Sequence, residues 1–129
     1  MHVIFGGAFN GKRAYVEKRT QGRDVQWLNV EADMHVLLST TEVIVVVGVE
    51  NLSESKAKEL LKKLVEWDNS VEVIVIATEI GRGIVPMDAS LRKLRDDVGR
   101  FYQQLFTKAS SVTRIWYGIA QTIKGDVWR

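Results

Sequence analysis

The sequence predicts a single α/β domain over residues 1–129, a three-layer sandwich in which helices cover a mostly parallel sheet. Short apolar blocks rich in β-branched and aromatic residues alternate with segments of helical period. The two central blocks are apolar at nearly every position, which is typical of strands covered on both faces. A length of 129 residues, 46% of them hydrophobic, suits one core and leaves no room for a second.

Four apolar blocks are expected to form strands. They cover residues 3–5, 43–47, 71–77 and 112–118. The polar stretch from Lys18 to Asp24 is interpreted as a surface loop. With helices between these strands the order is strand, helix, strand, helix, strand, helix, strand, and parallel neighbours should be joined by right-handed crossovers.

Helices are expected in the intervals between the strands. Ser53 can cap one of them, Glu54 suits the positive end of its dipole, and an apolar stripe follows from Ala57 to Val65. Another is expected from about Asp88 to Ala109, because apolar residues keep the helical period there and Pro86 blocks an earlier start.

The composition supports few classes of partner. Eighteen basic residues face sixteen acidic ones, so the charge does not call for nucleic acid. The chain has no cysteine and only two histidines, His2 and His35, which argues against disulfides and zinc and favours a reducing cytoplasm. The longest apolar run, Val43 to Val49, is far shorter than a membrane span, and the first residues do not resemble a signal peptide.

The residues after the first strand match the G-x-x-x-x-G-K phosphate loop. In such a loop the backbone N–H groups and the following helix N-terminus face a phosphate, and the lysine reaches the outer phosphates. A glycine-rich turn before a lysine is the alternative, but the position directly after an N-terminal strand favours a P-loop NTPase-like domain that binds GTP or ATP. The expected nucleotide-binding residues are Gly6, Gly7, Ala8, Phe9, Asn10, Gly11, Lys12 and Arg13.

Two positions depart from an ordinary magnesium site. Arg13 stands where a serine or threonine would offer its hydroxyl to Mg²⁺, and Gly48 stands where an acidic residue usually follows the next strand. Glu50, two residues later, is interpreted as a solvated loop carboxylate. Glu79 is the better candidate acid, because it closes the strand 71–77 on the side where α/β sheets bind ligands. No metal ligand is therefore assigned, and the loop is expected to hold a nucleotide while handling Mg²⁺ poorly.

The segment after that strand has a distinctive sequence. Residues 79–86, Glu-Ile-Gly-Arg-Gly-Ile-Val-Pro, resemble the E-V-G-x-G-I-V-P segment of the bifunctional adenosylcobinamide kinase/adenosylcobinamide-phosphate guanylyltransferase family. At that family's spacing, residues 94–105 are similar to its F-R-D-x-x-G-R-x-N-Q-x-L helix, with Tyr102 in place of the asparagine. Upstream, residues 22–23 and 27–31 resemble its G-R-P…W-x-T-x-E segment.

The resemblance implies a role in cobalamin biosynthesis or salvage. Enzymes of the family phosphorylate the aminopropanol hydroxyl of adenosylcobinamide and then join GMP to the product through a guanylylated histidine. The resemblance also implies a homotrimer. As a kinase, this chain would use Lys12 to steady the transferred phosphoryl group and Glu79 or Glu31 to orient a metal or the hydroxyl. Lys18 and Arg19 occupy the places of the family's histidine pair, so guanylyl transfer is not expected. The alternative is a non-catalytic relative that binds a nucleotide or cobinamide phosphate.

A loop and a helix face are expected to form the other wall of the cleft. The glycines of residues 79–86 could equally serve a tight turn, and the charged residues of the helix could form a solvated face with an i,i+4 pair between Asp96 and Arg100. Elsewhere, Trp27 is interpreted as a packing residue at the domain edge, with ligand contact as the alternative. The expected wall residues are Gly81, Gly83, Pro86, Arg95, Asp96 and Arg100.

Overall fold

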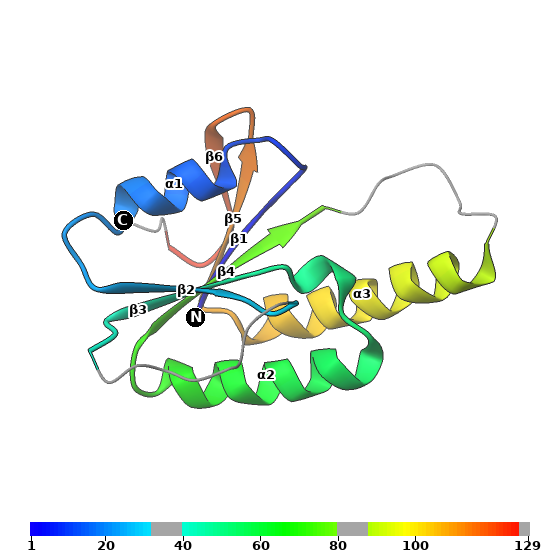
Figure 1. Cartoon of the computed structure of the whole chain (residues 1–129). Helices are drawn as coiled ribbons and strands as arrows, with labels where there is room; N and C mark the ends of the chain where they lie inside the picture. Colours follow the sequence, from blue (N-terminus) through cyan, green and yellow to red (C-terminus); the bar gives the residue numbers. More distant parts are fainter. Residues whose placement is uncertain (32–39, 80–87, 127–129) are drawn as a thin grey trace.

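The computed structural model describes residues 1–31, 40–79 and 88–126, and its centre is one six-stranded sheet (Figure 1). Across the sheet the strand order is β2-β3-β4-β1-β5-β6. The first five strands run parallel to their neighbours, and β6 pairs antiparallel with β5. The strands are β1 (His2–Gly6), β2 (Val25–Asn29), β3 (Val43–Val47), β4 (Glu72–Thr78), β5 (Ser111–Trp116) and β6 (Ile119–Lys124). The predicted α/β class with a mostly parallel sheet is confirmed.

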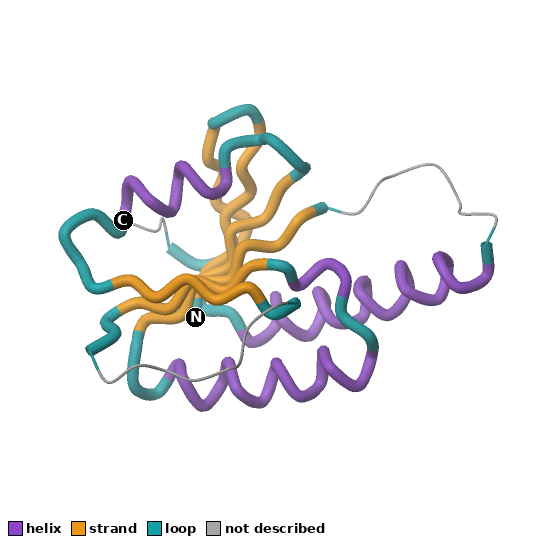
Figure 2. Tube along the Cα trace, viewed as in Figure 1, coloured by secondary structure: helices purple, strands orange, loops and turns teal. Residues whose placement is uncertain are grey.

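Helices cover the two faces of the sheet unequally. The short helix α1 (Lys12–Arg19) lies on one face, and α2 (Glu54–Asp68) and α3 (Ala89–Lys108) lie side by side on the other (Figures 1 and 2). The core is accordingly in two clusters. Val16 of α1 packs with Ile4 and Ile115, whereas α2 and α3 pack over the second, larger cluster. This is the three-layer arrangement expected from the sequence.

The starts of the two long helices test the capping predictions. Asp88 is the N-cap of α3, and its carboxylate accepts a hydrogen bond from the Ser90 backbone N–H at 2.7 Å. Ser53 holds the N-cap position of α2, but its side chain makes no capping hydrogen bond there and lies 3.5 Å from the Ser55 hydroxyl. The position predicted for this cap is therefore right, and the predicted capping bond is absent from the described structure.

Two predicted boundaries are wrong, and two strands, β2 and β6, interrupt the expected alternation of strands and helices. The stretch interpreted as a loop from residue 18 includes the last turn of α1, because Lys18 and Arg19 are helical. The strand expected to reach residue 118 ends at Trp116, and Tyr117 and Gly118, with φ of 49° and 78°, form the tight turn of a hairpin. Both edge strands, β2 and β6, were not predicted, because each is short and mixes apolar with polar residues, so neither gives the apolar run of a central strand.

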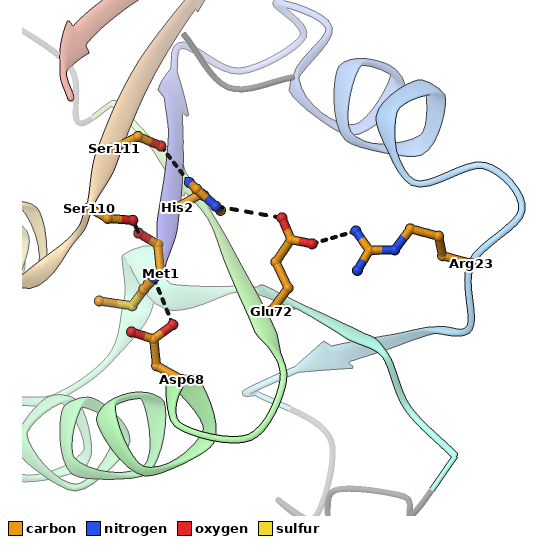
Figure 3. A network of polar contacts seen from close by, with 7 residues as sticks. All are labelled: Met1, His2, Arg23, Asp68, Glu72, Ser110 and Ser111. Carbon is orange, nitrogen blue, oxygen red and sulfur yellow. Dashed lines mark hydrogen bonds and ion pairs between the residues drawn. The ribbon is translucent and has the colours of Figure 1, made fainter. Parts of the chain in front are cut away.

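A polar network joins the N-terminal ends of β1, β4 and β5, at the opposite end of these strands from the phosphate loop (Figure 3). His2 Nδ1 lies 2.6 Å from the Ser111 hydroxyl, and its Nε2 lies 3.5 Å from a Glu72 carboxylate oxygen. Glu72 is in turn ion-paired with Arg23. Burial lowers the pKa of His2 below its usual value, the nearby Glu72 carboxylate opposing the shift. The neutral imidazole is therefore the form that this network favours.

None of the helices in the described part of the chain combines the length and the apolar character that crossing a membrane would need.

Candidate functional site

The phosphate loop begins where β1 passes very close to β5. A Cβ at residue 6 would lie 2.3 Å from the carbonyl oxygen of Ile115, so only glycine fits there. The chain then turns, Gly11 adopts a left-handed conformation with φ of 89°, and α1 starts at Lys12. The strand, glycine loop and helix that the motif requires are thus in place, with the N-terminus of α1 at the loop.

Lys12 is folded back into its own loop. Its ammonium donates hydrogen bonds to the carbonyl oxygens of Gly7 at 2.6 Å and Gly6 at 3.1 Å, and only 8% of the residue is exposed. Burial lowers the pKa of Lys12, while the carboxylates of Glu50 and Glu79 oppose that shift. The structure therefore holds a cation inside the loop, next to two acidic side chains.

A cavity of about 490 Å³ opens beside the loop. It lies where the C-terminal ends of β3 and β4 meet the start of α1, which is the side on which open α/β sheets bind ligands. Its lining residues come from the loop, from α1 and from the ends of these two strands. They are Phe9, Asn10, Gly11, Lys12, Arg13, Ala14, Val47, Gly48, Glu50, Ile76 and Thr78.

The two carboxylates that act on the charge of Lys12 lie in segments that follow different strands. Glu79 follows β4 directly. Its backbone N–H donates to the Gly6 carbonyl at 2.7 Å, and its carboxylate lies 3.5 Å from the Arg114 guanidinium. Glu50 lies in the 3-10 helix η1 (Val49–Asn51), which turns it back over the cavity. One Glu50 carboxylate oxygen is buried and makes no hydrogen bond within the described residues. The interpretation of Glu50 as a solvated loop carboxylate is therefore wrong.

Sequence analysis also passed over Tyr102, noted only as a replacement for asparagine. This residue of α3 is buried, and its hydroxyl donates to the carbonyl of Thr78, a cavity-lining residue, at 2.7 Å. Burial raises the pKa of Tyr102, with the Glu50 carboxylate adding to the rise. The hydroxyl therefore stays protonated and fixes the end of β4 beside Lys12. Its place in the helical repeat predicted only a core residue, so nothing in the pattern revealed this contact.

The residues at the usual magnesium position do not fit the ion. The Arg13 guanidinium lies 4.7 Å from the centre of the Trp27 ring, a cation–π contact that holds it against β2. Gly48 has φ of 83°, and a Cβ there would lie 2.6 Å from Asn29 Oδ1, so an acidic side chain would strain the backbone and displace the Asn29 side chain. Within residues 1–31, 40–79 and 88–126, no group of three or more His, Cys, Asp or Glu residues could hold a metal. We therefore assign no step to Mg²⁺.

Glu31 lies close to the cavity without lining its described part. Its carboxylate accepts a hydrogen bond from the Asn51 side chain at 2.7 Å, and its backbone N–H donates to Asn29 Oδ1 at 3.0 Å. These contacts place Glu31 beside Gly48 at the end of β3. Its suggested role in orienting a hydroxyl stays a prediction.

The charged residues predicted for the cleft wall lie on α3. Arg95 is half-buried, Asp96 is exposed, and neither they nor Arg100 line the described cavity. Arg100 is ion-paired with the buried Asp97, which also accepts a hydrogen bond from Lys93 at 2.9 Å. The expected Asp96–Arg100 pair is thus wrong by one residue.

The other three wall residues, Gly81, Gly83 and Pro86, fall outside the described part of the chain. Their predicted place in the cleft stays a prediction.

Comparison with known families adds the decisive observation. The model of the cobinamide kinase/cobinamide phosphate guanyltransferase family matches residues 31–123, well over half of the chain. The chain belongs to this family. Membership implies a cobinamide kinase/guanylyltransferase-like role in cobalamin biosynthesis and the use of a nucleotide. The match starts after the phosphate loop, so the loop is supported by its own sequence and geometry.

The other comparisons are less informative. A search of curated proteins found no match. Among solved structures, the solution structure of protein NMB1076 from Neisseria meningitidis overlaps with 77% of this chain and 69% of its own, at 16% identity and a TM-score of 0.36. An overlap this loose carries no argument about the site.

Proposed function

We propose that this protein is a kinase that transfers the terminal phosphoryl group of GTP or ATP to the hydroxyl of adenosylcobinamide. The observation that supports the proposal is Lys12, a buried residue whose ammonium is held in the phosphate loop and which lines the cavity beside that loop. A triphosphate oxygen offers Lys12 a stronger, charge-assisted hydrogen bond than the Gly6 and Gly7 carbonyls do. Nucleotide binding would therefore draw the ammonium out of the loop and onto the outer phosphates.

In the proposed reaction the hydroxyl oxygen of the substrate attacks the γ-phosphorus. The bond from that phosphorus to the β–γ bridging oxygen breaks, and the nucleoside diphosphate leaves. Glu79, whose backbone N–H donates to the Gly6 carbonyl beside the loop, is the carboxylate that we propose to orient the hydroxyl and accept its proton. Lys12 and the N-terminus of α1 stabilise the charge that builds on the phosphoryl oxygens.

We do not extend the proposal to guanylyl transfer. The positions of the family's histidine pair carry Lys18 and Arg19 in α1. His2 lies in the polar network at the opposite end of β1 (Figure 3), and His35 falls outside the described residues. A non-catalytic binding protein is the second candidate, favoured by the Arg13–Trp27 contact and by a glycine with positive φ, Gly48, at the position of the usual acid.

A phosphotransfer assay separates the two candidates. Cobinamide is incubated with γ-labelled GTP or ATP, with and without Mg²⁺, and label on the corrinoid is measured. The kinase proposal predicts transfer by the wild type and by Lys18→Met, an exposed lysine of the same helix, and loss of transfer in Lys12→Met. Nucleotide binding without any transfer would favour the binding protein.

By family resemblance we also propose a homotrimer in solution, and a monomeric mass by sedimentation would contradict that.

A further inference from the structure

Three aromatic side chains stand in solvent around the phosphate loop. Phe9, within the loop, is fully exposed, and Tyr117 and Trp116 of the β5–β6 hairpin are 76% and 59% exposed. A single exposed aromatic residue is ordinary, but a group of them on neighbouring segments usually marks a binding surface. These three residues are called the aromatic rim below.

The hairpin is fastened directly to the phosphate loop. The Gly118 backbone N–H donates to the Asn10 carbonyl at 3.0 Å, and the Gly118 Cα lies 3.7 Å from the point where a Cβ on Gly11 would be. Figure 1 shows the tip of the hairpin next to the segment that leads into α1. The hairpin tip therefore keeps a fixed place beside any phosphate held by the loop.

The hairpin turn also sets how its rings are presented. Tyr117 and Gly118 both have positive φ, the pattern of a two-residue type I′ turn, which is a tight and well-defined connection. The rings of Trp116 and Tyr117 are 5.8 Å apart between centroids and are tilted by 47°. The positive φ of Tyr117 is the conformation that this turn requires at its first central residue.

We propose that the aromatic rim is the nucleobase subsite of this protein, with the base stacked on the hairpin rings while the triphosphate occupies the loop. This inference rests on the proposed nucleotide-dependent function and names the part of the ligand that the loop itself cannot recognise. The loop offers N–H groups and Lys12, which bind phosphate. The hairpin offers flat apolar faces, which bind the π-face of a base. Both halves of a nucleotide are thereby matched by neighbouring, hydrogen-bonded segments.

A second copy of the chain is the competing occupant. Ile119 and Ile123 of β6 are also exposed, and β6 is an edge strand of the sheet. Trp116, Tyr117 and also Ile119 lie at the end of the hairpin that contacts the phosphate loop, whereas Ile123 lies near the far end of β6. This distribution favours a ligand bound at the loop over a partner bound along the strand edge.

The test compares a ligand that has a base with one that has none. ATP and inorganic tripolyphosphate are titrated into the wild type, the double variant Trp116→Ala/Tyr117→Ala, and the control Ile123→Ala. Base stacking on aromatic rings corresponds to roughly 5- to 100-fold in affinity. The double variant should therefore bind ATP more weakly than the wild type by about that factor. Its affinity for tripolyphosphate should stay within about twofold of the wild-type affinity. Ile123→Ala should match the wild type for both ligands.

Several results would overturn the inference. One is an unchanged ATP affinity in the double variant. Another is an equal loss for both ligands, which would mean that the hairpin only supports the loop. A change of mass by sedimentation with ATP affinity intact would assign the rim to self-association. Failure of the wild type to bind ATP, GTP or tripolyphosphate would instead refute the proposed function. Because both rings are exposed, the variants should stay folded, and circular dichroism checks this.

Discussion

Replacing Gly48 by alanine should destabilise the protein. The residue has φ of 83°, and the added Cβ would lie 2.6 Å from Asn29 Oδ1, the atom that accepts the Glu31 backbone N–H at 3.0 Å. Left-handed backbone costs a residue with a Cβ about 1–2 kcal/mol. Displacing the Asn29 side chain loses a hydrogen bond of about 0.5–1.5 kcal/mol. The free energy of unfolding should therefore fall by about 1.5–3.5 kcal/mol in total.

A second Gly→Ala substitution serves as a control, because it should change the free energy of unfolding in the opposite direction. Gly99 lies inside α3 without positive φ, and a Cβ there would meet nothing within 4 Å. Gly99→Ala should therefore stabilise the protein by about 0.5–1 kcal/mol. Urea unfolding of both variants and the wild type gives the two differences. A Gly48→Ala variant within about 0.5 kcal/mol of the wild type would refute the claim that a side chain at this position is strained, since that is the usual spread of harmless substitutions.

Three further predictions concern charge and chemistry. In the Arg13→Ser variant, nucleotide affinity should rise on adding Mg²⁺, because a hydroxyl replaces a permanently charged group that has no lone pair to offer. Calorimetry that shows the same magnesium response in the wild type and the variant would contradict this. The free energy of unfolding should decline as pH drops below about 6.5, because burial lowers the pKa of His2 in the folded state and the unfolded chain binds the proton first. His2→Gln should flatten that decline in urea titrations across pH, and an unaltered slope would remove His2 as its source. No GMP adduct on a histidine should form with labelled GTP, and mass spectrometry that finds one would reverse this.

The central architecture was predictable because its signals are local. β3 and β4 are apolar at nearly every position, and this is what strands covered on both faces require. The glycine spacing located the phosphate loop because close approach to Ile115 and a left-handed turn at residue 11 both demand glycine. In these elements the local structure demands a particular residue type, so the residue type alone predicts the structure.

The site was less predictable because its contacts join distant segments. Glu50 lines the same cavity as Lys12 because η1 follows β3 directly, and a short 3-10 turn leaves no periodic pattern. The pairing of Arg13 with Trp27 depends on β2, an edge strand that the apolar pattern did not reveal. The hairpin turn did carry a signal, since a Tyr-Gly pair between two strands suits positive φ at the glycine. It was missed because the residues before it continue an apolar block.

Titration of the wild type and Lys12→Met with GTP and ATP tests the nucleotide site most directly. Methionine keeps most of the buried volume of the side chain and removes its charge, so the loop retains its amide donors. A charged hydrogen bond contributes about 1.5–3 kcal/mol, so Lys12→Met should bind either nucleotide roughly 10- to 150-fold more weakly. Lys18→Met, on the exposed side of the same helix, should bind like the wild type. Equal affinity of Lys12→Met and the wild type, or no binding by the wild type, would contradict a nucleotide role for this loop.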